Sequence, residues 1–328
     1  MEDDNHTSVS EFILVGLSGR PQTQHLLFAA ILATYLATLG GNLLIVGLVR
    51  ANSCLHTPMY FFLSHLSFLE ICYTSCTIPQ ALAHLLTRSK SIPFARCAAQ
   101  MYLALSLGST EAILLAAMAY DRLVAVCWPL RYATLMGWGR YWALALSSWA
   151  AGFLLSVVNV ACTLRLPFCG PNRVNHFFCE LPVVLELACT DTRLTEALLK
   201  LSCSDTSLNK VVLLAGTVLL GAIPFLCIVV SYVAITRAVL QIRFAQAQWK
   251  AFSTCASHLA VVTLFYTTCM FNYNRPTSGH PLYVDTLASV LYNVVTPMLN
   301  PLIYSLRNKE VKAALKHAIG KKNSSLKT

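Results

Sequence analysis

The chain has 328 residues, of which 56% are hydrophobic and only 12% are charged. Soluble domains carry about 25% charged residues, so this composition excludes an ordinary water-soluble fold. The formal net charge is +10, yet no polar segment interleaves basic and aromatic side chains as a nucleic-acid-binding surface would. We therefore expect the basic residues to contact anionic membrane lipid, and we expect no nucleic-acid partner.

Seven hydrophobic runs divide the sequence. Each is long enough to cross a hydrocarbon layer, which takes about 20 apolar residues in a helix. The sequence therefore predicts an all-α membrane protein, a seven-transmembrane helix bundle that forms one domain over residues 1–328. The expected spans are 26–49, 58–86, 98–127, 141–161, 210–237, 250–274 and 283–306.

Lys and Arg collect on one side of these spans. If residues 1–25 lie outside the cell, the cytoplasmic loops and tail carry 14 basic and two acidic residues, whereas the external segments carry ten of each. An excess of basic residues marks the cytoplasmic side. We expect a multi-pass plasma-membrane protein with an external N-terminus and a cytoplasmic C-terminus. The external sequon that begins at Asn5 is expected to carry a glycan.

A short amphipathic helix is expected after the last span, at residues 307–319, followed by a cytoplasmic tail at 320–328. Its apolar positions form one stripe and its lysines lie off that stripe, as in a helix along the inner membrane face. The alternative is a charged tail that stays solvated. The stripe consists of Val311, Ala314, Leu315, Ala318 and Ile319.

Four segments carry motifs in chain order. They are HTPMYFFLSHLSFLEICY at 56–73, MAYDRLVAVC at 118–127, KAFSTCASHL at 250–259 and PMLNPLIYSLRN at 297–308. Together they resemble the tetrapod-type olfactory receptors, a branch of the rhodopsin-like G-protein-coupled receptors. The outer-loop segment LPFCGPNRVNHFFCE at 166–180 also looks like this family. The resemblance implies an odorant receptor that binds small, mostly neutral hydrophobic volatiles and activates a stimulatory, cAMP-raising G protein.

Three features depart from the pattern of that family. Leu123 stands where the family has Tyr, which puts G-protein contact and basal activity in doubt. Glu70 stands where the family has Asp, so the carboxylate reaches one methylene further. Residues 187–199 align with residues 201–213 at an offset of 14, where the family has one such segment.

The external cysteines lie on the side of the membrane where disulfides form. The resemblance pairs Cys97 with Cys179. The equal spacing of Cys169, Cys179 and Cys189 suggests a second bridge between Cys169 and Cys189. A bridged cysteine cannot ligate a metal, so we expect no metal site on this loop, although a His lies three residues before Cys179.

Two carboxylates, Glu70 and Glu111, are expected inside the hydrocarbon region. Intramembrane acids are costly and are functional candidates by default. One interpretation is a pair of protonated acids that hydrogen-bond to Asn42, Asn300 or serines. The other is a sodium or proton site that links the second, third and seventh spans, and the resemblance favours it. We expect no other cofactor.

The ligand pocket is expected in the outer half of the bundle, where side chains share helix faces at three- and four-residue spacing. Ordinary helix packing gives the same pattern, and the resemblance is what makes these positions a ligand site. They carry a few hydroxyls and no charge, and Ala104 stands where amine receptors have Asp, which favours a neutral ligand. The expected ligand-binding residues are Leu105, Gly108, Ser109, Ala112, Gly216, Thr217, Leu220, Tyr266, Cys269, Met270, Tyr273 and Asn293.

The inner half carries the residues that the resemblance assigns to activation. Pro301 removes a backbone donor from the last span, which suits a helix that bends near its inner end. The set consists of Asp121, Arg122, Tyr232, Asn300, Pro301 and Tyr304.

Other functions fit the sequence less well. A receptor for a non-odorant metabolite outside the olfactory epithelium is the nearest alternative. A transporter would repeat its spans and interrupted helices, whereas only an outer loop repeats here. A membrane hydrolase needs a nucleophile with a base, or a metal cluster, and His65 and His258 stand alone in the sequence. We therefore expect a receptor and not an enzyme.

Overall fold

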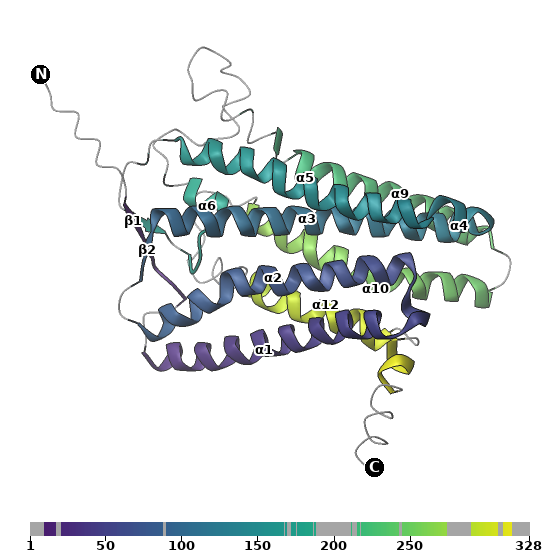
Figure 1. Cartoon of the computed structure of the whole chain (residues 1–328), viewed down its shortest axis with the longest axis horizontal. Coiled ribbons are helices and arrows are strands. Elements are labelled where there is room, and N and C mark those ends of the chain that lie inside the picture. Colours follow the sequence, from purple (N-terminus) through teal and green to yellow (C-terminus); the bar gives the residue numbers. More distant parts are fainter. Residues whose placement is uncertain are drawn as a thin grey trace, which may run out of the picture.

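Long helices running along one axis form an elongated bundle (Figure 1). The computed structural model describes residues 10–17, 21–87, 90–166, 168, 172–174, 176–185, 187, 211, 215–216, 218–242, 245–273, 290–307 and 311–316. The long helices are α1 (Pro21–Ala51), α2 (Pro58–Leu86), α3 (Phe94–Cys127), α5 (Trp138–Leu164), α9 (Ile223–Leu240), α10 (Ala245–Tyr273) and α12 (Thr296–Arg307).

Shorter elements connect or extend these helices. Two of the long helices follow a π-helical turn. Val218–Ala222 leads into α9, and Leu291–Val295 leads into α12. The remaining short elements are the helices α4 (Tyr132–Leu135) and α6 (Leu181–Leu185) and the 3-10 turns Ser53–Leu55 and Pro129–Arg131.

Every predicted span is helical over the residues that the structure describes. The second span coincides with α2, whereas α1 and α10 each begin five residues before the predicted start. Hydropathy detects only the part of a helix inside hydrocarbon, while its hydrogen bonds continue into the interface. Five helical segments of the described chain are long and apolar enough to cross a membrane, and in α10 the apolar part is Cys255–Met270.

The amphipathic helix is confirmed over residues 311–316, which are helical. Val311 and Ala314 are buried against the bundle, while Lys312 and Lys316 are exposed. The other residues of the expected segment after Arg307 lie outside the described part of the chain.

A three-stranded sheet covers one end of the bundle, opposite the end that holds α4 (Figure 1). Strand β1 (Glu11–Leu14) pairs antiparallel with β2 (Ser91–Pro93) and parallel with β3 (Arg173–Val174). Phe12 lies in van der Waals contact distance of two other rings, with centroids 5.8 Å from Phe94 and 6.0 Å from Phe168. The sequence did not predict this sheet, because its strands of two to four residues are too short to show an alternating pattern.

The Gly40-Gly41-Asn42 motif is the point at which α1 approaches α12. A Cβ atom on Gly41 would lie 3.1 Å from the Pro301 ring. The Asn42 side-chain amide donates to the carbonyl oxygens of Thr38 at 3.0 Å and Pro297 at 3.4 Å. A small residue thus lets two backbones approach, and the neighbouring amide bonds across the contact.

Helix α3 is the centre of the bundle, since it packs against α2, α5, α9 and α10. Its contact with α5 is closest at Gly152. A Cβ atom there would lie 2.1 Å from Thr110 Oγ1, 2.9 Å from the Thr110 nitrogen and 3.0 Å from the Ser106 carbonyl oxygen. Gly152 therefore sets the distance between the two helices.

We predict that Gly152→Ala destabilises the protein, because the added methyl group meets α3 backbone atoms that cannot move independently. Overpacking of this kind costs about 1–3 kcal/mol. Thermal unfolding of the purified protein measures the change. Gly139→Ala is the matched control on the same helix, since a Cβ atom at Gly139 meets no atom within 4 Å. Equal melting temperatures for the two variants would contradict the close contact.

Candidate ligand pocket

A disulfide between Cys97 at the start of α3 and Cys179 in the outer loop holds this loop over the interior of the bundle. We call the covering part of the loop the roof. The disulfide confirms the predicted pairing. Gln100 reinforces it: its Oε1 accepts from the Cys179 backbone N–H at 2.9 Å, and its Nε2 donates to the Cys76 carbonyl oxygen at 3.0 Å. The loop residues after Cys179 are thereby held over the helices. Cys169 and Cys189, the proposed second bridge, lie outside the described residues, as does Asn5.

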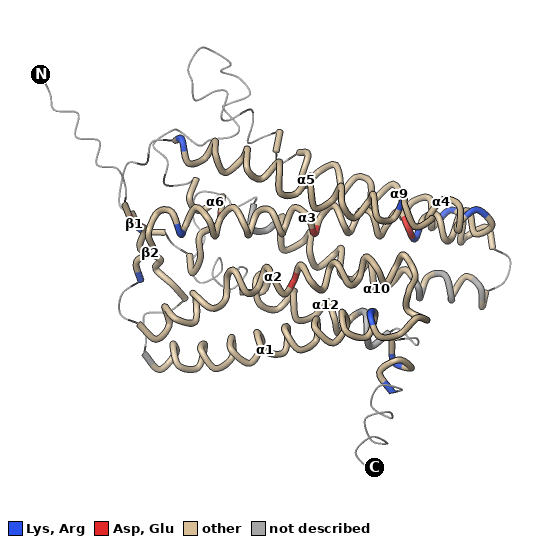
Figure 2. The backbone as a smooth tube through the Cα atoms, viewed as in Figure 1, with Lys and Arg blue, Asp and Glu red and all other residues tan. Residues whose placement is uncertain are grey.

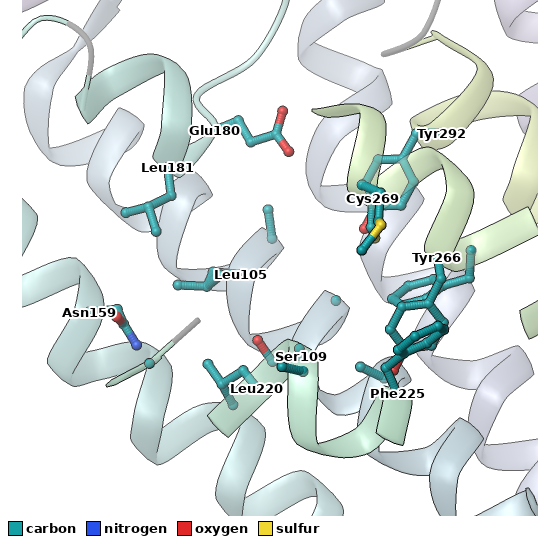
Figure 3. A pocket seen from close by; sticks show the side chains of 18 of the residues that line it. Leu105, Ser109, Asn159, Glu180, Leu181, Leu220, Phe225, Tyr266, Cys269 and Tyr292 are labelled. Atoms are coloured by element: carbon teal, nitrogen blue, oxygen red, sulfur yellow. The ribbon is translucent and has the colours of Figure 1, made fainter. Parts of the chain in front are cut away.

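A cavity of about 330 Å³ lies beneath this roof. Figure 3 shows Glu180 and Leu181 at one end of it, Phe225 and Tyr266 at the other, and Leu105 and Ser109 of α3 between them. Nine of the twelve residues predicted to bind ligand line it: Leu105, Gly108, Ser109, Ala112, Gly216, Leu220, Tyr266, Cys269 and Met270.

The two π-helical turns both face this cavity. The turn Val218–Ala222 contributes four lining residues, and Tyr292 from the turn Leu291–Val295 contributes another. Such turns re-aim side chains within a helix and occur often at functional sites. Gly216 has a related role, since a Cβ atom there would lie 2.2 Å from the side-chain oxygen of Asn159. The missing Cβ lets the Asn159 amide reach the cavity wall.

One predicted ligand residue points elsewhere. Asn293 is fully buried, and its side-chain oxygen accepts a short hydrogen bond from the Tyr73 hydroxyl on α2. It is not among the residues that line the cavity: the π-helical turn directs Tyr292 to the cavity and Asn293 to α2, and ligand contact at Asn293 stays a prediction. Thr217 and the Tyr273 side chain lie outside what the structure describes.

The predicted set carries no charge, but the cavity lining also includes Glu180, which the sequence analysis did not name. Its carboxylate lies 3.8 Å from His176 Nε2, and both residues are buried. Reasoning from the spans missed Glu180 because it belongs to a loop. Its position next to the bridged Cys179 was the available signal, since that bridge must bring the loop onto α3.

Comparison with known proteins decides the family. The family model described as olfactory receptor matches residues 31–322. This chain belongs to the olfactory receptor family. It is therefore a G-protein-coupled odorant receptor, a member of a receptor class and not of an enzyme family.

Similar curated receptors span the whole length of this one. Human olfactory receptor 1F1 is 48% identical over 98% of both chains, and human olfactory receptor 2D2 is 48% identical over 96% of this chain and 97% of its own. Rat olfactory receptor 1f45 is 45% identical over 97% of each. Squid rhodopsin shares the fold, with a TM-score of 0.66 at 15% identity over 92% of this chain and 86% of its own.

Two acidic residues of the receptor stand in the middle of α2 and α3, whereas most other charges lie toward the ends of the bundle (Figure 2). They are Glu70 and Glu111, which are both buried and lie close enough to influence each other. Asn300 of α12 donates a short hydrogen bond from its Nδ2 to Glu70 Oε1. The structure thus brings together α2, α3 and α12 at this point, as predicted from the sequence.

The inner end of α3 holds Arg122 beside its neighbouring acid. The Arg122 Nη2 atom lies 3.7 Å from Asp121 Oδ2, and both residues are buried. The Tyr132 hydroxyl of α4 donates to Asp121 Oδ1 at 2.7 Å. Burial, together with the Asp121 charge, raises the pKa of Tyr132 above its ordinary value, so the phenol remains a donor.

His258 links three helices near this end, although the sequence showed no partner for it. The Tyr232 hydroxyl of α9 and His258 Nδ1 of α10 lie 2.7 Å apart, and His258 Nε2 lies 3.1 Å from the Leu115 carbonyl oxygen of α3. Tyr232 is one of the predicted activation residues. Asn300 and Pro301 lie on α12, where Asn300 bonds to the buried acid Glu70, and the Tyr304 side chain lies outside the described part.

We predict that Cys179→Ser strongly lowers surface expression of the receptor, because the loop that roofs the cavity loses its covalent attachment. Loss of a native disulfide costs about 2–5 kcal/mol. Antibody labelling of intact cells measures the surface level. Cys162→Ser, which changes a half-buried free cysteine on α5, is the control and should stay near the wild-type level. Normal surface level and signalling of Cys179→Ser would overturn the role of the bridge.

Proposed function

We propose that the receptor binds a small, mostly neutral hydrophobic volatile in the cavity beneath the bridged loop and activates a stimulatory, cAMP-raising G protein. The cavity is the observation that carries this proposal. Its volume of about 330 Å³ is at the lower end of the ~300–1,000 Å³ typical of small-molecule sites. Its walls are mainly Leu, Ala, Gly, Val, Met and aromatic side chains.

A few polar groups would orient the ligand. The Tyr266 hydroxyl is buried and has no hydrogen-bond partner among the described residues. An oxygen-bearing ligand would satisfy it, because an unpaired buried hydroxyl is costly. Glu180 faces His176 within the protein, so a neutral ligand can leave this carboxylate paired. These positions favour an alcohol, aldehyde, ketone or ester over an amine.

Signalling requires that the ligand bind the open and closed states with different affinity. Helices α9 and α10 both line the cavity, and the same helices carry Tyr232 and His258 near the inner end. A ligand that changes how α9 and α10 pack near Phe225 and Tyr266 would also change the contacts of Tyr232. In this proposal, the receptor lies in the plasma membrane with its N-terminus outside and its G protein inside.

A receptor for a more polar metabolite is the second candidate, and Glu180 with Asn159 in the lining is the observation that favours it. Cells that express the receptor and report cAMP separate the two. Volatile alcohols, aldehydes, ketones and esters form one panel, and non-volatile polar metabolites form the other. Responses confined to the second panel would overturn the odorant proposal.

The buried acids are proposed to hold a sodium ion or a proton. Three buried acceptor atoms have no hydrogen-bond partner among the described residues: Asn42 Oδ1, Glu111 Oε1 and Asn300 Oδ1. Oxygen acceptors without donors suit a cation, so the residues fit sodium. Two buried carboxyl groups close to each other cannot both keep a charge at low cost, so they fit a shared proton too. Either would neutralise charge between α2, α3 and α12.

We predict that Tyr266→Phe lowers potency for an oxygen-bearing odorant by roughly twofold to twelvefold. The change removes one hydroxyl and keeps the ring, and one hydrogen bond is worth about 0.5–1.5 kcal/mol. Dose–response curves of cAMP production measure the shift. A hydrocarbon agonist of similar size is the control and should be almost unaffected. Equal losses for both agonists would show that Tyr266 acts through packing.

We predict that Glu111→Gln abolishes sodium dependence of receptor activation if the pair holds sodium. The amide keeps the shape of the side chain and removes its negative charge. Nucleotide exchange on the G protein, compared between sodium and potassium buffers, measures this. Glu180→Gln, which changes an acid of the cavity, should keep the wild-type sodium response. A wild-type sodium response in Glu111→Gln would leave only the shared-proton interpretation.

A further inference from the structure

A second hollow lies on the outer surface of the bundle, between one face of α9 and one face of α10. It has a volume of about 720 Å³. Its apolar side chains Val229, Val233, Leu259 and Met270 are 38–56% exposed, so in a membrane they face hydrocarbon. We call this hollow the α9–α10 groove. The groove forms because α9 packs mainly along α3 and touches α10 over only a small area.

The α9–α10 groove and the ligand cavity share a wall. Three residues, Phe225, Tyr266 and Met270, line both spaces. The rings of Phe225 and Tyr266 lie 4.9 Å apart and are inclined at 51°. Figure 3 shows these two side chains at the end of the cavity away from Glu180. The thickness of one pair of side chains therefore separates the ligand cavity from the lipid.

The water-facing end of the cavity is more heavily covered. The three-stranded sheet, the disulfide at Cys179 and the buried rings of Phe177 and Phe178 lie at that end, and Glu180 with Leu181 forms the roof. Opening this end breaks a sheet or displaces a cross-linked loop. Opening the lipid-facing wall requires a rotamer change of aromatic side chains and breaks neither a strand pairing nor a disulfide.

We propose that the α9–α10 groove is the access route by which an apolar ligand dissolved in the bilayer reaches the cavity, with Phe225 and Tyr266 as the side chains that move. This inference rests on the proposed ligand class. Each methylene favours transfer out of water by about 0.8 kcal/mol, so a volatile with a long carbon chain is far more concentrated in lipid than in water. The groove then receives ligand from the more concentrated source.

A bound phospholipid is the alternative occupant of the α9–α10 groove. Arg237 lies at the inner end of the groove and could hold a lipid phosphate. The shared wall favours the ligand, because continuity with the cavity matters for a ligand in transit and has no role for a lipid that remains outside.

The test uses the full-length receptor in phosphatidylcholine vesicles and the photoreactive alcohol 3-azioctanol as probe. The probe is mixed with the vesicles and flashed after increasing delays, and mass spectrometry measures labelling of cavity residues on α3. Val229→Trp fills the groove one turn below Phe225. Val230→Trp is the matched control, because Val230 is the adjacent lipid-facing valine, is 67% exposed and does not line the groove.

We expect Val229→Trp to slow cavity labelling about tenfold while its final extent equals that of the wild type, because an obstructed route changes the rates of association and dissociation together. Val230→Trp should match the wild type in both. Unchanged labelling rates in Val229→Trp would overturn the route and leave the proposed function intact. Absence of cavity labelling in the wild type would overturn the proposed ligand class and the route with it. In a last arm, phosphatidylserine is added to the vesicles. If it slows cavity labelling and Arg237→Ala restores the rate, the occupant of the groove is a lipid instead.

Discussion

Polar side chains buried within the hydrocarbon region must find partners inside the protein, and this requirement decides where the helices of the receptor meet. Each interhelical polar pair ties two spans at a defined depth. The pairs link α1 to α12, α2 to α12, α2 to the π-helical turn before α12, α2 to α5, and α9 to α10. They are Asn42 with Pro297, Glu70 with Asn300, Tyr73 with Asn293, His65 with Trp149, and Tyr232 with His258.

These pairs leave the outer half of α9 and α10 comparatively free. Near its inner end, α10 is linked to other helices by hydrogen bonds of His258 with Tyr232 and Leu115 and of Ser257 with Ile303. Around the cavity, α10 instead makes apolar and aromatic contacts such as Phe225 with Tyr266. Apolar contacts are non-directional and tolerate sliding. The contact of α9 with α10 beside the cavity is therefore held by apolar and aromatic packing.

Much of this arrangement could be predicted from the sequence, because periodicity and small residues act locally. Helical spacing placed Leu105, Ser109 and Ala112 of α3 on one face, and the structure puts all three on the cavity. The sequence did not show that Asn293 turns toward α2, since a π-helical turn shifts the side-chain directions that ideal helical spacing assumes. Periodicity also says nothing about Glu180, because this loop residue is positioned by the disulfide of its neighbour Cys179 with Cys97.

Leu123, where the family has Tyr, lies at the contact of α3 with α9 and α10. Leu123 of α3 packs on an apolar cluster formed by Ile235 and Val239 of α9 and Cys255 of α10. This cluster joins the three helices next to Arg122. Separating α9 and α10 from α3 exposes these side chains, at about 25 cal/mol for each Å² of apolar surface. Leu123 adds apolar surface to this cluster. Unlike a tyrosine, it has no hydroxyl that could form a new hydrogen bond when the helices separate. The contact of α3 with α9 and α10 is thus held by apolar burial as well as by the hydrogen bonds of His258.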